Sequence, residues 1–290
     1  MREIKVNSKF DGKKVTNLIL NEFPRLSLNV LNKAYRKKDI RINGNKISKN
    51  MVVHVGDIVS IYITDEYLLN LPKYNIQEMI VYEDENILIL NKPSDICVTK
   101  ENEKEVSLMD LCEEYNPDIQ PVHRLDRNTK GLVVFSKNEN SYQELLQCFK
   151  DRLIEKYYKC LVLGIPQEKE KLLTAYLFKD SKNNIVNISN TKKKGYEEIK
   201  TYYKVLECRN DNTSILEVNL LTGKTHQIRA HLASIGHPII GDGKYGIGEI
   251  NKKFKKNTQE LYAYKLVFNT KNLPNLAYLD GKTIEIECKI

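Results

Sequence analysis

The stretch PVHRLDRNTKGLVV, residues 121–134, is a polar and charged loop that leads directly into an apolar strand. Asp126 lies in this loop between Arg124 and Arg127, and nearby positive charge keeps a carboxylate ionised. An ionised carboxylate can act as a nucleophile or as a base. Because an Arg-x-Asp-Arg sequence by itself usually forms a surface salt bridge, the rest of the chain has to support a catalytic interpretation.

The body of the chain around this loop is rich in strand patterns. A helix is predicted at residues 141–149, where apolar side chains recur at helical spacing. Runs of alternating or continuous apolar residues predict strands at residues 79–82, 87–91, 131–136, 157–163, 198–206, 214–221 and 262–268. These patterns predict an α+β body with a large, mostly antiparallel sheet.

Two further stretches, IEKYYKCLVLG (154–164) and LTGKTHQIRAHL (221–232), combine polar side chains with regular apolar spacing. A tyrosine in a strand such as the first usually packs in the core or against the sheet. The second predicts a helix over residues 225–235, with a buried stripe formed by Ile228, Leu232 and Ile235. His226 and Arg229 share another face of that helix.

The second stretch also invites two interpretations that its spacing excludes. Gly223-Lys224-Thr225 is not a phosphate-binding P-loop, because the required glycine five residues earlier is Val218. His226, His231 and His237 do not have the spacing of a helical zinc pair, and no cysteine or acidic residue is placed to complete a site. We therefore expect no metal.

The three stretches, in this order, resemble the HRLDxxTxGL, KxYxAxVxG and TG[R/K]xHQ[I/L]RxH motifs of the RluA-type RNA pseudouridine synthases. The resemblance covers residues 77–290. It implies a synthase domain with a large mixed, mostly antiparallel sheet and flanking helices. It also implies an isomerase that converts uridine to pseudouridine in structured RNA by flipping out the base. Such an enzyme needs no cofactor.

The resemblance assigns roles to individual residues. Asp126 is the implied catalytic aspartate, and Tyr158 packs on the flipped base and is the best candidate to remove the C5 proton. Arg229 is implied to pair with Asp126, and we expect a buried bidentate contact that fixes the carboxylate. Arg124 would fill the vacated RNA stack. The remaining implied RNA contacts of this domain are His123, Lys156 and His226.

Three positions depart from the family pattern. Lys130 stands where serine is usual, Cys160 replaces alanine, and Tyr262 stands where histidine is common. We expect Lys130 to add a charge beside the catalytic loop and Tyr262 to alter an RNA contact.

The first quarter of the chain carries all of the excess positive charge. Residues 1–64 hold 13 Lys and Arg against 5 Asp and Glu, which accounts for the whole net charge of +8. Asymmetry of this kind points to a polyanion-binding module. The pattern predicts a first helix that ends at Pro24, a second capped by Ser27, a hairpin around Asn43-Gly44, and a strand over residues 53–63.

This unit resembles the S4 RNA-binding domain. The predicted organisation is an S4-like domain at residues 1–66, a linker at 67–76 and the synthase domain at 77–290. The implied RNA contacts of the S4-like unit are Arg36, Lys37, Lys38 and Arg41.

The composition also leads to predictions of the cellular location and the oligomeric state. There is no apolar run long enough for a membrane span and no signal-peptide pattern, so we expect a cytoplasmic protein. The six scattered cysteines predict neither disulfides nor a zinc site, and we expect a monomer.

The target is expected to be large-subunit ribosomal RNA, with transfer RNA as an alternative. The sequence is also compatible with a non-catalytic S4-type RNA-binding protein, or with a hydrolase that uses His226 and Asp126. It leaves open whether Asp126 acts as a nucleophile or as the base that forms a glycal.

Overall fold

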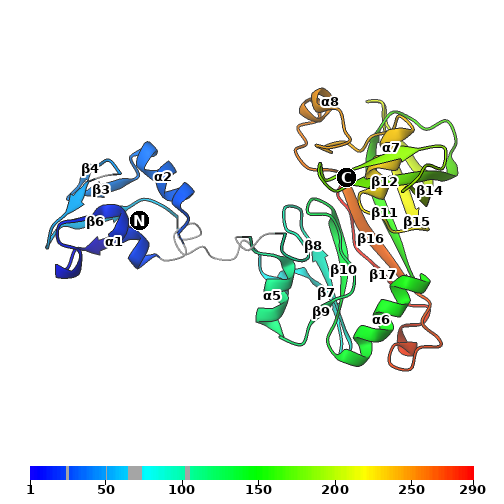
Figure 1. The fold of residues 1–290 in the computed structure, drawn as a ribbon, viewed down its shortest axis with the longest axis horizontal. Coiled ribbons are helices and arrows are strands. Elements are labelled where there is room, and N and C mark those ends of the chain that lie inside the picture. The colour runs from blue at the N-terminus through cyan, green and yellow to red at the C-terminus, as the bar shows by residue number, and fades with distance from the viewer. Residues whose placement is uncertain (24–25, 50, 65–73, 102–104) are drawn as a thin grey trace. The chain divides into compact units, whose positions relative to one another are not determined.

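The computed structural model describes residues 1–23, 26–49, 51–64, 74–101 and 105–290. The chain divides into two compact units, Met1–Asn75 and Ile76–Ile290 (Figure 1). Pro24 and most of the predicted linker, including Pro72, lie outside the described residues. No helix in the described part of the chain is long and apolar enough to cross a membrane.

The N-terminal unit is built from short elements, and its two longer helices are α1 (Val15–Glu22) and α2 (Leu28–Lys37). Ser27 caps α2 by accepting the Val30 N–H at 3.3 Å, as predicted. A four-stranded antiparallel sheet has the order β1 (Arg2–Lys5), β6 (Ile58–Ile61), β3 (Ile40–Ile42), β4 (Asn45–Lys46). A second, two-stranded sheet pairs β2 (Lys13–Lys14) with β5 (Val52–Val53). A 3-10 turn, η1 (Ser8–Phe10), precedes β2.

Two turns organise this unit. The predicted hairpin is present between β3 and β4, where Asn43 and Gly44 both have positive φ (49° and 79°), as a tight hairpin turn requires. The single strand predicted over residues 53–63 is wrong. Gly56, with φ of 92°, turns the chain and separates β5 from β6.

The second unit is organised by one eleven-stranded sheet among the described residues. Its main path runs β13 (Ile185–Ser189), β12 (Glu170–Asp180), β14 (Glu197–Cys208), β15 (Thr213–Leu220), β11 (Ile154–Leu163), β16 (Leu261–Phe268), β10 (Lys130–Ser136), β8 (Ile87–Lys92), β7 (Ile80–Glu83). β17 (Thr283–Glu285) joins β16, and β9 (Gln120–Pro121) joins β10. Among the described strands of this sheet, only β10 and β16 pair in parallel, so the predicted mixed, mostly antiparallel sheet is confirmed. The hairpin of β12 and β13 was not predicted.

Helices cover different parts of this sheet. α6 (Glu139–Asp151) buries Leu145 and Cys148 against β8, β10 and β16, and α7 (Gln227–Ser234) packs through Ala230 on β12, β13 and β14 (Figure 1). The remaining helices are α4 (Ile76–Met79), α5 (Leu108–Tyr115), α8 (Gly248–Lys253) and the 3-10 turn η2 (Ala277–Leu279). All six cysteines, which lie in described residues, are free.

The predicted stripe of α7 is partly wrong. Ile228 and Leu232 are buried, but Ile235 lies beyond the helix and is 38% exposed, and Arg229, outside that stripe, is only 7% exposed, as its expected buried pairing requires. The helix is enclosed on more than one side, so its buried positions do not follow a single apolar stripe.

Gly131 of β10 lies against the backbone of Ala263 in β16. Its φ is +111°, and a Cβ atom built on it would lie 2.1 Å from the Ala263 carbonyl oxygen. No side chain fits there without moving one of the strands.

We predict that Gly131→Ala lowers the free energy of unfolding by about 2–4 kcal/mol, because backbone strain and a backbone clash add together. The measurement is urea unfolding followed by circular dichroism. The matched control is Gly248→Ala, where an added Cβ meets nothing within 4 Å. Equal midpoints for both variants would contradict the prediction.

Candidate active site

Asp126 lies in the loop between β9 and β10, and three hydrogen bonds fix that loop. The Thr129 N–H donates to the Asp126 carbonyl at 3.0 Å, and the buried Gln259 amide donates to the Thr129 hydroxyl at 2.7 Å. Lys92 Nζ donates to the Arg127 carbonyl at 2.8 Å. The backbone on both sides of the aspartate is therefore held in place.

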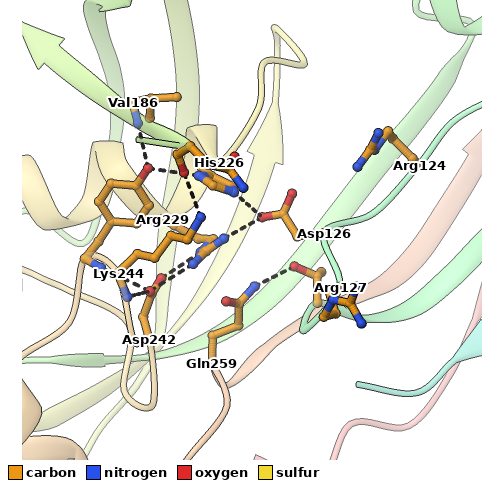
Figure 2. A network of polar contacts seen from close by, with 12 residues as sticks. Arg124, Asp126, Arg127, Val186, His226, Arg229, Asp242, Lys244 and Gln259 are labelled. Atoms are coloured by element: carbon orange, nitrogen blue, oxygen red, sulfur yellow. Dashed lines mark hydrogen bonds and ion pairs between the residues drawn. The ribbon is translucent and has the colours of Figure 1, made fainter. Parts of the chain in front are cut away.

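Arg229 of α7 contacts two carboxylates (Figure 2). Its Nη1 donates to Asp126 Oδ2 at 2.8 Å, while its Nε and Nη2 donate to the two oxygens of Asp242 at 2.7 and 3.0 Å. The expected pairing of Arg229 with Asp126 is present as a single hydrogen bond. The expectation that this pair is bidentate is wrong, because the fork of the guanidinium is engaged by Asp242.

Asp242 is 1% exposed, and its carboxylate accepts four hydrogen bonds, two from Arg229 and two from the N–H groups of Lys244 (2.8 Å) and Tyr245 (3.1 Å). Burial by itself raises the pKa of Asp242, but the Arg229 contacts and the two N–H groups outweigh it and lower that pKa. Burial likewise opposes the charge on Arg229, and the two aspartates overcome it and raise its pKa. The guanidinium and the Asp242 carboxylate are therefore both charged.

His226 precedes α7 in the left-handed conformation, with φ of 53°. Its Nδ1 is 2.9 Å from the Tyr245 hydroxyl, and its Nε2 is 3.9 Å from Asp126 Oδ2. Since the Tyr245 oxygen already accepts the Val186 N–H at 2.8 Å, its own proton is available to Nδ1. Burial lowers the pKa of His226. The contacts therefore favour a neutral ring whose proton on Nε2 faces Asp126.

Tyr158 is buried in β11, where its register partners are Val218 and Ala263. Burial, and then the charge of Asp126, raise the pKa of Tyr158 far above its ordinary value. The side chain is therefore a neutral phenol in the free protein. Tyr157 makes separate contacts, donating to Glu155 at 2.6 Å.

His123 and Lys156 come together at a different place, around Phe149 of α6. His123 Nε2 accepts the Val134 N–H at 2.9 Å, and the His123 ring lies 4.4 Å from that of Phe149. Lys156 Nζ is 5.1 Å from the Phe149 ring. Burial lowers the pKa of both His123 and Lys156. Their contacts are those of core packing, and RNA binding by either residue stays a prediction.

Arg124 lies on the same loop as Asp126 (Figure 2). Its side chain is 63% exposed, with one nitrogen 3.6 Å from Glu101. Arg127 forms ion pairs with Glu101 and Glu105. Arg124 is thus the arginine of the loop that is more available to a ligand.

Lys130 and Tyr262, two of the departures from the family pattern, contact each other. They are cross-strand partners of β10 and β16, and Lys130 Nζ donates to the Tyr262 hydroxyl at 2.7 Å, with Glu260 at 3.6 Å. Side chains alternate along a strand, so Tyr262 lies on the sheet face opposite Ala263, the partner of Tyr158. The added charge is therefore matched by Glu260. Cys160, the third departure, is fully buried.

Two buried residues of the site were not predicted. These residues are Asp242 and Lys92. Lys92 is fully buried and donates to three carbonyls, those of Pro93, Ile96 and Arg127, at 2.8–2.9 Å. Burial lowers the pKa of Lys92 to about 7. A lysine near the end of the apolar run of β8 was the signal for it.

The predicted RNA contacts of the N-terminal unit gather at the end of α2 and the start of β3. Arg36 and Lys37 form the last turn of α2, and Lys38 ends it with φ of 62°. Arg41 lies on β3, 4.8 Å from the Tyr62 ring. Among the described residues there is no group of three or more His, Cys, Asp or Glu that could hold a metal ion.

Comparison with known proteins agrees with this geometry. Residues 86–234 match the family model described as RNA pseudouridylate synthase. Proteins named ribosomal large subunit pseudouridine synthase C are 32% identical in Buchnera aphidicola (91% of this chain, 88% of the relative) and 26% identical in Vibrio cholerae (99% and 92%).

The solved structure of human RNA pseudouridylate synthase domain containing 1 is 24% identical, with a TM-score of 0.59 over 73% of this chain and 82% of that one. That likeness shows the shared fold. The chain thus belongs to the RNA pseudouridylate synthase family, in its RluA-type branch, and is a pseudouridine synthase.

Proposed function

We propose that the protein isomerises specific uridines of large-subunit ribosomal RNA, with Asp126 as the catalytic residue. The observation that carries this assignment is the hydrogen bond from Arg229 to Asp126. Asp242 holds the Arg229 guanidinium in place through a second contact. The names of the relatives support ribosomal RNA as the target. Transfer RNA is the alternative. The cytoplasmic location and the monomeric state stay predictions.

The reaction breaks the N1–C1′ bond, rotates the base and forms a C5–C1′ bond. The proton leaves C5, N1 gains one, and no electrons are exchanged with a partner. In this proposal Asp126 acts at C1′ of the sugar or at the neighbouring C2′ proton. Arg229 orients the carboxylate, and the Nε2 proton of His226 faces the same group.

Tyr158 supplies a buried aromatic ring beside Asp126, on which the flipped base can pack. Proton removal from C5 by Tyr158 stays a prediction. Because its pKa is raised in the free protein, the phenol must first lose its own proton. Arg124, exposed on the same loop, fills the RNA stack that the target base has left.

We predict that Asp126→Asn abolishes tritium release from RNA labelled at uridine C5, with a loss of about 1,000-fold or more, while RNA affinity is kept. The nearly isosteric amide cannot act as a nucleophile or a base. Ribosomal and transfer RNA are assayed separately, and the pool that responds identifies the substrate class. Asp118→Asn, an exposed change in the loop before β9, is the matched control. Release at the wild-type rate by the Asp126 variant would contradict the assignment.

Asp242 gives a prediction for stability. Asp242→Asn leaves the buried Arg229 without its bidentate partner. We expect this change to lower the free energy of unfolding by about 3–5 kcal/mol. The pKa of Asp242 is lower in the folded protein than in the unfolded chain. Its stabilisation is therefore present above the ordinary aspartate pKa and is lost as the pH falls through the folded value.

Urea unfolding of wild type and variant between pH 7 and pH 3 measures this effect. The difference in free energy of unfolding between wild type and variant should become smaller as the pH falls below about 4. A difference in free energy of unfolding that stays constant over this range would show that the charge of Asp242 does not cause the stabilisation.

The basic end of α2 gives a prediction for salt dependence. Replacing Arg36, Lys37, Lys38 and Arg41 together with glutamine removes up to four phosphate contacts. The slope of log affinity against log salt should then fall by about 3. Lys150→Gln with Lys271→Gln, two positions in the second unit away from the catalytic loop, is the control and should leave the slope unchanged. An unchanged slope in the four-site variant would mean that other cations grip the RNA.

A further inference from the structure

One side chain beside the candidate active site, Tyr245, has no part in the reaction proposed above. Tyr245 lies half-buried in the segment between α7 and α8. Its ring makes an edge contact with the His226 ring, at 5.6 Å between centroids, and the Arg229 guanidinium lies 5.3 Å from the centroid of Tyr245. Its hydroxyl joins His226 to the backbone of Val186 in β13. Tyr245 thus contacts both of the side chains that face Asp126 from α7 and its N-terminal end.

The direction of these hydrogen bonds is fixed at the Val186 end. A backbone N–H can only donate, so the Tyr245 oxygen accepts from Val186 at 2.8 Å and its own proton goes to His226 Nδ1 at 2.9 Å. An imidazole that accepts at Nδ1 carries its proton on Nε2, the nitrogen 3.9 Å from Asp126 Oδ2 (Figure 2). A second proton on Nδ1 would displace the Tyr245 proton from its acceptor. The contacts therefore hold the imidazole neutral.

The charged groups around His226 act in both directions. Burial has the largest effect and lowers the pKa of His226. Of the charged neighbours, Asp126 and Asp242 raise that pKa, and Arg229 and Lys244 lower it. An imidazolium would give Asp126 a second cation in addition to Arg229. A carboxylate that is paired with two cations is a weaker nucleophile and a weaker base.

We propose that Tyr245 is a positioning residue for the reaction at Asp126. Its hydroxyl, held by Val186, keeps His226 uncharged and keeps the Nε2–H of that ring directed at Asp126. Asp126 therefore retains one cationic partner, Arg229, and stays reactive. The hairpin of β12 and β13 supports the site through Val186. The proposal rests on the proposed function, because it presumes that Asp126 is catalytic.

The first test measures tritium release from C5-labelled ribosomal and transfer RNA by the full-length protein between pH 8 and pH 6. Tyr245→Phe removes the hydroxyl and leaves the ring. The hydrogen bond to the neutral imidazole is lost, which raises the pKa of His226 in the variant. The variant should match the wild type within about 2-fold at pH 8 and be slower by about 3- to 10-fold at pH 6, as the loss of one hydrogen bond to the neutral form predicts.

Lys92 titrates in the same range, because burial lowers its pKa to about 7. Lys92 is common to both proteins, so the ratio of the variant rate to the wild-type rate is compared at each pH. Tyr82→Phe is the matched control, since it removes from β7 a tyrosine hydroxyl that donates to Asp84 at 2.7 Å. The control should equal the wild type at every pH. Thermal unfolding midpoints establish that each variant is folded.

His226→Gln separates positioning from support of the fold. Glutamine cannot become charged, so in this background the Tyr245 hydroxyl has no ring whose charge it can control. Adding Tyr245→Phe to His226→Gln should then change the rate by less than about 2-fold at pH 6. If Tyr245 only supports the hairpin, the loss is the same in both backgrounds and at every pH.

The second test needs no RNA. The full-length protein labelled with ¹⁵N in its five histidines reports the protonation of each ring nitrogen by NMR, and His226→Gln identifies the signals of His226. In the wild type, His226 should be neutral at pH 7, with its proton on Nε2. In Tyr245→Phe, the ring should gain its second proton at a higher pH than in the wild type.

An imidazolium at pH 7 in the wild type would overturn the proposal. A loss in Tyr245→Phe that does not vary with pH, or that persists in the His226→Gln background, would overturn it as well. These results leave the proposed function intact when the wild type releases tritium and Asp126→Asn does not. No release by the wild type, or release by Asp126→Asn at the wild-type rate, overturns the proposed function and the positioning role together.

Discussion

One buried guanidinium, that of Arg229, links the segments that form the candidate active site. Arg229 lies between Asp126 and Asp242, and these three residues come from different segments of the chain. Burying charges costs several kcal/mol for each ion, and only good geometry with further hydrogen bonds offsets that cost. Asp242 meets this requirement with two backbone N–H groups as well as the bidentate contact. The fold can thus present a single guanidinium nitrogen to Asp126.

The loop that carries Asp126 is held as firmly as its partner. Lys92 binds the Arg127 carbonyl from the end of β8, and Gln259 binds Thr129 from the segment before β16. Gly131 then allows β10 to approach β16 more closely than any side chain would permit. If Asp126 has the catalytic role proposed above, these contacts would serve catalysis as well as stability, because placement errors of about an ångström cost large factors in rate.

The described charged groups of the N-terminal unit lie at its surface and are not buried in ion pairs as Arg229 is. Its cations at the end of α2 lie at the surface. In the proposed RNA-binding role they would attract phosphates over a distance that salt limits.

The sequence by itself determined the elements whose signals are local. The Asp126 loop and the buried strand after it, the Ser27 cap, the Asn43-Gly44 hairpin and the antiparallel character of the sheet follow from spacing and residue type. The motifs also brought Asp126 and Arg229 together, which a family pattern encodes.

Tertiary structure alone decided which groups meet across the chain. The bidentate contact of Arg229 is made with Asp242. His123 and Lys156 lie against Phe149, and Lys130 pairs with Tyr262. The tertiary structure also exposed Ile235, against the predicted stripe of α7. Periodicity describes one face of one element, whereas burial and ion pairing depend on the segments that pack around it. Those segments are distant in sequence, and so their effect cannot be read from local spacing.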